Sequence, residues 1–270
     1  MGEEGCKLEI RKQVDEGDTM TKNNKGANPP SGEGLGENVD WGKRADKGFL
    51  ASGIDPADRK GHKNRYIDLL QKTALEEVLE LRGDEAVLDF GCGSGRLSYW
   101  IAPRVKKVVG LEVTPEMIDL AKQNRSAENA EFILYDGNRF PEMANSFDVI
   151  LSVGVLQIMA GENLTKVISA LSRYLDPAGR FLIIEQVSDN PRIKRPPVNE
   201  YLRAFKESGL NCLRYYPIRS GRGGLLYLIR YGLIPERWFP CIASWELKKM
   251  RQKTGRISYY RDYLFVAEKA

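Results

Sequence analysis

The chain has 270 residues, which is room for one large domain or two small ones. Hydrophobic residues make up 42% of it and charged residues 29%, and the formal net charge is +4. This composition excludes a collagen-like, a wholly disordered or a disulfide-scaffold protein. No apolar run approaches the ~20 residues that a membrane-spanning helix needs. The net charge is −4 over residues 1–40, −3 over 41–190 and +11 over 191–270, so the basic excess lies in the last third.

The first forty residues are predicted to be a disordered tail, because their apolar residues are too sparse to offset the entropy of ordering. No apolar signal segment is visible at the start of the chain. The cysteines lie far apart without a Cys-x-x-Cys pair, which favours a reducing compartment over a disulfide framework or a zinc site. We therefore expect a cytoplasmic protein without a bound metal ion.

From residue 63 onward, apolar strands alternate with amphipathic helices, which predicts a doubly wound and mostly parallel α/β sheet with right-handed crossovers. The expected strands are Ala86–Phe90, Lys107–Glu112, Glu131–Tyr135, Phe147–Ser152, Arg180–Gln186, Asn211–Tyr216 and Tyr259–Ala267. The expected helices are 63–81, Arg96–Ala102, Pro115–Gln123, Asn163–Leu175 and Val198–Ser208.

The segment 218–258 interrupts this alternation. It contains closely spaced glycines, the apolar stretch Leu225–Ile229 and a cluster of aromatic residues. Such long connections are usually lids or binding elements. The sequence thus predicts a domain over residues 41–270 with an inserted lid or acceptor segment at about 218–258.

The strongest motif is Val87-Leu-Asp-Phe-Gly-Cys-Gly-Ser-Gly-Arg96. A buried strand carries an acid, Asp89, and then runs through three glycines at alternate positions (Gly91, Gly93, Gly95) into a helix. Alternate glycines let the backbone turn tightly and approach a ligand without side chains in the way. The carboxyl end of a strand in an open wound sheet is also the expected ligand crevice.

This spacing distinguishes two cofactors. A nicotinamide dinucleotide site has Gly-x-Gly-x-x-Gly, whereas here an acid precedes Gly-x-Gly-x-Gly. At this point the chain resembles the class I S-adenosylmethionine-dependent methyltransferases of the small-molecule type. The resemblance covers roughly residues 63–216 and returns at Asp262-Tyr-Leu-Phe-Val-Ala-Glu-Lys. It implies a Rossmann-like, seven-stranded sheet whose last strand is antiparallel and pairs with 211–216.

Glu112 ends the second strand, where a carboxylate can accept hydrogen bonds from both hydroxyls of a ribose. The resemblance implies that Asp136 and Gly137, after the third strand, hold the adenine, with Asp136 accepting from its amino group. It places Ser152 and Gln157 beside the donor and acceptor pockets. Many relatives carry a histidine where Gln157 stands. Met117 is a candidate for packing on the adenine, or is simply part of the core.

Few residues are candidates for a general base. Glu185 closes the fifth strand and is expected near the crevice as base or acceptor contact; His62 is the only histidine and precedes the first helix. For the acceptor, an apolar wall edged by arginines predicts contacts from Arg195, Arg219, Arg222 and Trp238. Each of these also has a simpler interpretation as a solvated or structural residue.

We therefore expect methyl transfer from S-adenosylmethionine to oxygen or nitrogen of a small molecule that is anionic or partly hydrophobic. The basic last third also leaves shallow membrane contact open. An RNA methyltransferase is the main alternative, although no RNA-binding module is recognisable. A non-catalytic donor-binding partner subunit is another, and a hydride-transferring oxidoreductase ranks lowest.

Overall fold

A seven-stranded sheet organises the protein. The computed structural model describes residues 39–124, 126–143 and 146–270, so the tail predicted for residues 1–40 lies almost entirely outside the described residues. The strands are β1 (Ala86–Phe90), β2 (Lys107–Glu112), β3 (Ala130–Leu134), β4 (Phe147–Val153), β5 (Leu175–Val187), β6 (Leu210–Ser220) and β7 (Arg261–Lys269).

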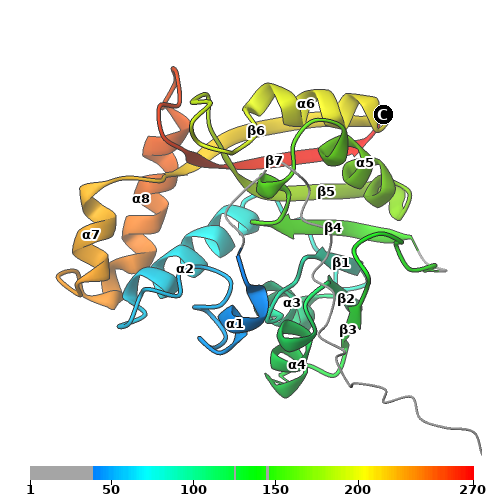
Figure 1. Cartoon of the computed structure of the whole chain (residues 1–270), viewed down its shortest axis with the longest axis horizontal. Coiled ribbons are helices and arrows are strands. Elements are labelled where there is room, and N and C mark those ends of the chain that lie inside the picture. The colour runs from blue at the N-terminus through cyan, green and yellow to red at the C-terminus, as the bar shows by residue number, and fades with distance from the viewer. Residues whose placement is uncertain (1–38, 125, 144–145) are drawn as a thin grey trace, which may run out of the picture.

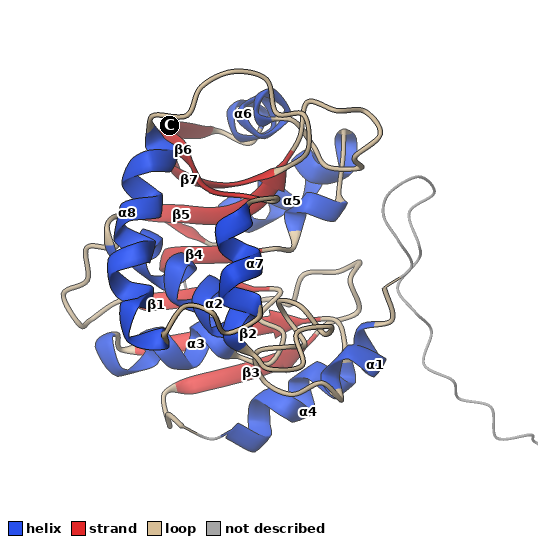
Figure 2. Ribbon diagram, turned by 90° about the vertical axis from the view of Figure 1, so that its left-hand side faces the viewer, coloured by secondary structure: helices blue, strands red, loops and turns tan. Residues whose placement is uncertain are grey.

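The strand order is β3-β2-β1-β4-β5-β7-β6, which Figure 2 shows as a stack from β6 at the top to β3 at the bottom. Strands β1 to β5 pair in parallel. The last strand, β7, runs antiparallel between β5 and β6. The predicted fold class, a mostly parallel seven-stranded sheet with an antiparallel last strand, is confirmed.

Helices cover both faces of the sheet (Figure 1). They are α1 (Trp41–Ala45), α2 (His62–Glu76), α3 (Arg96–Ile101), α4 (Pro115–Asn124), α5 (Glu162–Ser172), α6 (Val198–Glu207), α7 (Gly224–Arg230) and α8 (Phe239–Arg251), with 3₁₀ turns η1 (Ala102–Arg104), η2 (Leu156–Ile158) and η3 (Glu236–Trp238). One apolar cluster joins the sheet to α2, α3, α7 and α8, and a second joins it to α5 and α6.

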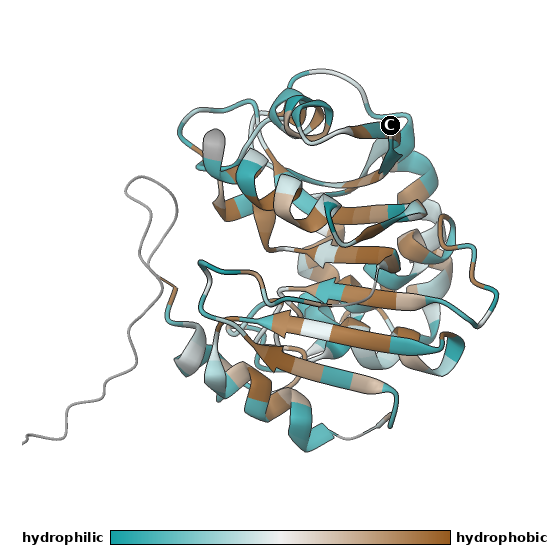
Figure 3. Ribbon diagram, turned by 90° about the vertical axis from the view of Figure 1, so that its right-hand side faces the viewer, coloured by the Kyte–Doolittle hydropathy of each residue, from teal (hydrophilic) through white to brown (hydrophobic). Residues whose placement is uncertain are grey.

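The central strands are buried on both faces, which explains their continuous apolar runs. In β1 the last four residues are buried, and in β4 only the second and last residues are not. The strand ribbons are accordingly brown over most of their length in Figure 3. At ~25 cal/mol per Å² of apolar surface removed from water, this layer supplies the main stabilisation of the fold.

Some element boundaries differ from the predictions for a physical reason. The helix expected over Asn163–Leu175 ends at Ser172, and β5 begins at Leu175 instead of Arg180. Pro177 lacks the N–H that a helix would need, and it favours an extended conformation at the preceding residue. The chain therefore leaves the helix before Pro177 and enters the strand directly.

The segment between β6 and β7 folds into helices that the sequence pattern did not predict. It forms α7, η3 and α8, and α8 packs against both α2 and β6. Helix α1, also unpredicted, packs against α4. Within the described ranges, the structure contains no helix that is long and apolar enough to cross a bilayer.

Candidate functional site: the glycine loop and the crevice beside it

The three motif glycines all adopt left-handed backbone conformations, with φ of 69°, 54° and 77° at Gly91, Gly93 and Gly95. A Cβ at Gly91 would lie 2.3 Å from Val155, and one at Gly95 would lie 2.8 Å from Phe132. These two glycines are therefore required by close packing. A Cβ at Gly93 would meet no atom within 4 Å. Gly93 is the position where the loop opens to space that a ligand can occupy.

The Glu112 carboxylate lies directly against this loop. Its Oε2 accepts the N–H of Gly93 at 3.0 Å. Its Oε1 accepts the N–H groups of Val113 at 2.8 Å and Thr114 at 3.0 Å. The structure thus brings together the ribose acid and the glycine loop, which are separated by nearly twenty residues in the chain. An ionised carboxylate offers about four acceptor positions, so about one remains for a hydroxyl donor, and a second becomes free if the Gly93 N–H is released.

Asp89, in β1, stabilises the strand and the helix on either side of the loop. Its side chain is buried, and its Oδ2 accepts the hydroxyl of Ser98 at 2.6 Å, which ties β1 to α3. Burial raises the pKa of Asp89 to about 6, against the lowering effect of the Ser98 bond. Because the Asp89 side chain hydrogen-bonds toward the protein interior, we infer that it affects donor binding only by stabilising the loop.

The predicted adenine residues lie at the ends of β3 and in α4. Asp136 is exposed, and its Oδ1 accepts the N–H groups of Asn138 and Arg139 at 2.8 and 2.7 Å. These bonds, the Arg139 N–H foremost, hold the pKa of Asp136 below its usual value. They leave Oδ2 outside the turn. Gly137 has φ of 78° and makes this turn possible. Met117 is 2% exposed, so its side chain packs within the protein.

Glu185 anchors the loop after β4 that was predicted to border the donor. Its Oε1 accepts the N–H groups of Val155 and Leu156 at 3.0 and 2.9 Å, and its Oε2 accepts that of Gln157 at 3.0 Å. The hydroxyl of Ser152, at 3.5 Å, also faces Oε1. Because both oxygens are occupied and the side chain is 1% exposed, Glu185 is a positioning residue here. The structure gives the predicted base or acceptor role of Glu185 no support.

Burial raises the pKa of Glu185 to about 8, although the three N–H donors oppose the shift. In the unfolded chain the group titrates near 4.5. Between these values the folded protein binds more protons than the unfolded one, so this contribution to stability is lost as the pH rises. We expect the free energy of unfolding of Glu185→Gln to depend less on pH than that of the wild type between about pH 5 and 8. Urea unfolding at several pH values measures this difference.

Glu142→Gln is the matched control, because the Glu142 side chain is exposed. Its pH dependence should follow the wild type. Equal slopes for Glu185→Gln and the wild type would show that Glu185 is already ionised in the folded state at the low end of this range.

His62, the other predicted base, begins α2 and faces the segment between α7 and η3. Its Nδ1 lies 2.7 Å from Glu236 Oε1, which also accepts from Arg65 Nε at 2.9 Å. These two bonds, that of Arg65 first, lower the pKa of Glu236. His62 therefore joins α2 to the predicted lid, and its side chain is occupied by an ion-pair cluster.

The predicted acceptor residues do not form one cationic rim. Arg219 is 4% exposed and donates from Nε and Nη2 to Asp262 Oδ2 at 2.9 and 2.7 Å. Arg222 lies over the ring of Tyr259 at 3.9 Å. Arg195 donates from Nε to Gln186 at 3.0 Å. Trp238, in η3, is exposed on the surface. Arg219 is thus neutralised by an aspartate, which its place in the sequence did not reveal.

Sequence reasoning missed a buried polar cluster around this pair, beneath α8 and beside the ends of β5, β6 and β7. The hydroxyl of Tyr66 in α2 donates to Glu246 in α8. Burial raises the pKa of Glu246 and that of Tyr66. Both are electrostatically coupled to Arg219. Only Asp262, quoted as the first residue of the last-strand motif, carried a signal that could have found the pair.

The chain before α2 also contributes to the site. The hydroxyl of Ser94, inside the glycine loop, donates to the backbone oxygen of Phe49 at 2.6 Å. Asp55 in the same segment pairs with Lys63 at 2.6 Å and with Arg230 of α7 at 3.3 Å. Residues 49–61 therefore connect the glycine loop with the segment between β6 and β7. This stretch has few apolar residues, so its sequence did not predict that it connects these two parts of the protein.

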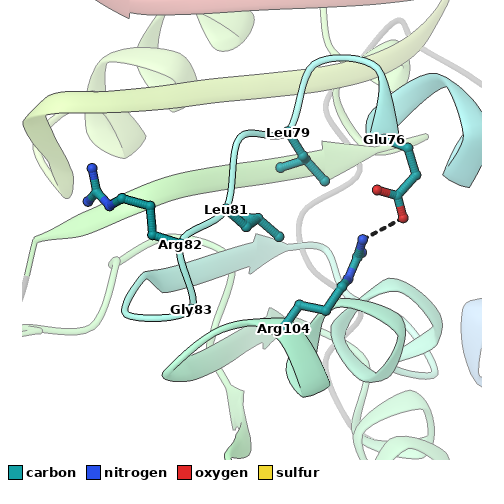
Figure 4. A pocket seen from close by; sticks show the side chains of 6 residues that line it. All are labelled: Glu76, Leu79, Leu81, Arg82, Gly83 and Arg104. Atoms are coloured by element: carbon teal, nitrogen blue, oxygen red, sulfur yellow. Dashed lines mark hydrogen bonds and ion pairs between the residues drawn. The ribbon is translucent and has the colours of Figure 1, made fainter.

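One surface hollow lies away from this site. It measures about 400 Å³ and is lined by residues at the end of α2, the loop before β1 and η1, as Figure 4 shows. That is the amino end of β1, whereas the glycine loop follows its carboxyl end. Among the described residues, no group of three or more histidine, cysteine or acidic side chains could hold a metal ion.

A comparison with protein families agrees with this geometry: residues 87–179 match the model of a methyltransferase domain. The matched region resembles a methyltransferase domain and makes up about a third of the chain. The match begins in β1 and runs through the glycine loop, Glu112, Asp136 and Glu162–Ser172. This match confirms, over these residues, the methyltransferase resemblance identified from the sequence.

Curated members of the family match over part of their length. An uncharacterised methyltransferase of Bacillus subtilis is 27% identical over 140 residues, which is 51% of this chain and 53% of the relative. Cyclopropane-fatty-acyl-phospholipid synthase of Escherichia coli is 28% identical over 128 residues, 47% of this chain and 33% of the relative. The chain thus spans between a third and about half of the length of these methyltransferase-family relatives.

Solved structures of the family share the fold at low identity. A Haloferax volcanii methyltransferase solved with the Trm112 activator gives a TM-score of 0.58 at 18% identity, with 87% of this chain and 99% of that chain covered. Geranyl diphosphate C-methyltransferase of Streptomyces coelicolor, solved with S-adenosylhomocysteine, gives a TM-score of 0.56 at 17% identity. The match covers 74% of this chain and 75% of that chain.

Proposed function

We propose that the protein transfers the methyl group of S-adenosylmethionine to an oxygen or nitrogen atom of a small molecule. The observation that carries the proposal is the open backbone at Gly93, with the Glu112 carboxylate hydrogen-bonded to its N–H. Other glycines, such as Gly209, also combine a positive φ with open space, but Gly93 does so beside the Glu112 carboxylate at the carboxyl end of β1. This pairing of an open backbone with a carboxylate supports an adenosyl ligand at the loop.

The residues around the crevice would bind and orient the two substrates. Bound S-adenosylmethionine supplies a methyl group that a positively charged sulfur activates. Glu112 would hold the ribose hydroxyls, and Asp136 Oδ2 would accept from the adenine amino group. Glu185 would fix Val155 to Gln157 beside the crevice. Positioning of this kind supplies up to ~7–11 kcal/mol of the barrier in well-aligned reactions.

The acceptor is proposed to approach along the loop after β4, where Glu185 holds Val155 to Gln157. Arg195, Arg222 and Trp238 are candidates for its outer contacts, because each reaches the surface near the ends of β5, β6 or α8. Arg219 would act through Asp262 and not as a free cation. An acceptor with an uncharged polar group is thus as well matched as an anionic one. No side chain is proposed as an obligatory general base.

Removal of the Glu112 carboxylate should weaken donor binding. We expect Glu112→Ala to lower the affinity for S-adenosylhomocysteine by about 1–3 kcal/mol, as for the loss of a hydrogen bond to a charged group. The three backbone N–H groups that donate to Glu112 would also lose their acceptor, so the midpoint of thermal unfolding should fall. Isothermal titration calorimetry and thermal unfolding measure the two effects.

Asp119→Ala provides the control, since Asp119 is an exposed carboxylate on the neighbouring helix α4. Its affinity should equal that of the wild type. A Glu112→Ala variant that binds S-adenosylhomocysteine as tightly as this control would remove Glu112 from the proposed ribose contact.

The reaction itself is testable without knowledge of the acceptor. The protein is incubated with donor carrying an isotopically labelled methyl group and with fractionated cell extract, and labelled products are identified. Label in a small molecule that depends on the wild-type chain, and is absent with Gly93→Arg, supports the proposal. Donor binding without any transfer would favour a donor-binding partner subunit.

RNA remains the second acceptor class. Relatives that share the matched region include cyclopropane-fatty-acyl-phospholipid synthase and an uncharacterised RNA methyltransferase, so this region alone does not identify the acceptor. Salt-sensitive retention of the protein on RNA, with label transferred to RNA, would replace the small-molecule proposal.

A further inference from the structure

Exposed apolar side chains concentrate in one short segment of the protein. Ten large hydrophobic residues are exposed in the described parts of the chain, and six of them lie between residues 227 and 245. We call these six the lid patch: Tyr227, Leu228, Tyr231, Leu233, Trp238 and Trp245, which are between 46% and 69% exposed. Five of the six belong to the stretch from α7 to η3.

Helix α7 is apolar around its whole circumference. Its sequence is Gly-Leu-Leu-Tyr-Leu-Ile-Arg, and Leu225, Leu226 and Ile229 pack against the core. Tyr227 and Leu228 point outward and are 60% and 46% exposed. A helix that is apolar on all sides is normally covered on all sides. In both Figure 1 and Figure 2, α7 lies at the outside of the molecule, with no further element beyond it.

The charges in the segment that carries the lid patch are mostly positive. Residues 218–258 contain nine basic and two acidic side chains. Of the two acids, Glu236 is paired with His62 and Arg65, and Glu246 accepts from the buried Tyr66. The exposed cations include Arg222, Arg237, Lys248 and Lys249, whereas Arg251, also exposed, pairs with Glu77. This segment therefore offers apolar and aromatic side chains among cations that its acids leave unbalanced.

We propose that the lid patch docks on an anionic lipid bilayer. Leucine, tyrosine and tryptophan side chains partition into the interface of a bilayer, and lysine and arginine around them are attracted by anionic headgroups. A nucleic acid would match the cations and could stack on the aromatic rings, but it offers nothing to Leu228 and Leu233. The bilayer is the occupant that matches both the charge and the two leucines. This inference goes beyond methyl transfer and does not depend on it.

The test is flotation of the full chain with vesicles. The wild type should bind vesicles of phosphatidylcholine mixed with phosphatidylglycerol and float with them. It should bind vesicles of phosphatidylcholine alone much less, and high salt should release it from the anionic vesicles. Leu228→Ser/Leu233→Ser should lower the partition coefficient at least about tenfold. These two side chains are 46% and 69% exposed, so the variant should fold.

Leu213→Ser is the matched control, because Leu213 is a 43% exposed leucine on the edge strand β6. It should bind vesicles as the wild type does, and all variants should keep the wild-type affinity for S-adenosylhomocysteine. The proposal is overturned if the wild type does not bind anionic vesicles, or if Leu213→Ser loses as much binding as the lid variant, Leu228→Ser/Leu233→Ser. A concentration-dependent dimer that the lid variant abolishes, without vesicle binding, would assign the patch to a second copy of the chain.

Discussion

Gly93→Arg should abolish binding of S-adenosylhomocysteine while the protein remains folded. The glycine has φ of 54°, and a Cβ there would meet no protein atom within 4 Å. An arginine would extend into the space proposed for the donor and exclude the ligand by its bulk. The affinity should fall by more than about a hundredfold, which is ~2.7 kcal/mol. Calorimetric titration with S-adenosylhomocysteine measures the loss.

Gly209→Arg separates this effect from backbone strain. Gly209 follows α6, has φ of 69°, and a Cβ there would also meet nothing within 4 Å. Both variants impose a left-handed conformation on arginine at a cost of order 1–3 kcal/mol. Their unfolding midpoints should fall by similar amounts, whereas only Gly93→Arg should lose donor binding. Retained binding in Gly93→Arg would show that the donor lies elsewhere.

Loss of Asp262 should have the largest effect on stability. Arg219 and Asp262 are 4% and 3% exposed, and Arg219 donates twice to Asp262 Oδ2. Burial opposes the charge on Arg219, but Asp262 outweighs it and raises the pKa of the guanidinium. Asp262→Ala would leave this cation buried without its counter-ion. We expect the free energy of unfolding to fall by about 3–5 kcal/mol in urea denaturation.

Replacement of both partners tests the cause of that loss. Arg219→Met/Asp262→Leu removes both charges and keeps much of the volume, and buried pairs replaced in this way are often neutral or stabilised. The double variant should therefore recover most of the stability that Asp262→Ala loses. Equal destabilisation of the single and double variants would mean that packing at this position, and not the unpaired charge, explains the effect.

The sheet was predictable because its strands are short apolar runs bounded by turn residues. Val87 to Phe90 and Val108 to Leu111 are buried on both faces, and only a central parallel strand needs such a sequence. The segment from Gly224 to Arg251 was not predictable in the same way. Helix α7 has apolar residues on both sides, so its sequence lacks the helical periodicity that an amphipathic helix shows.

The donor side of the site was predictable and the acceptor side was not. Gly93 and Glu112 have roles that local sequence determines, namely an open left-handed turn and a strand end. The position of Arg219 depends on Asp262, which lies 43 residues further along the chain and meets it only through the pairing of β6 with β7. Glu185 similarly looked like a free strand-end acid, but it binds the N–H groups of a loop 28 to 30 residues earlier.

The most direct test is a crystal structure of the protein with S-adenosylhomocysteine. The account predicts the ligand along the glycine loop, with Gly93 against it and the Glu112 carboxylate within hydrogen-bond distance of both ribose hydroxyls. A ligand bound away from Gly93 would contradict this prediction. So would a structure in which Glu112 keeps its bond to the Gly93 N–H and the ribose lies elsewhere.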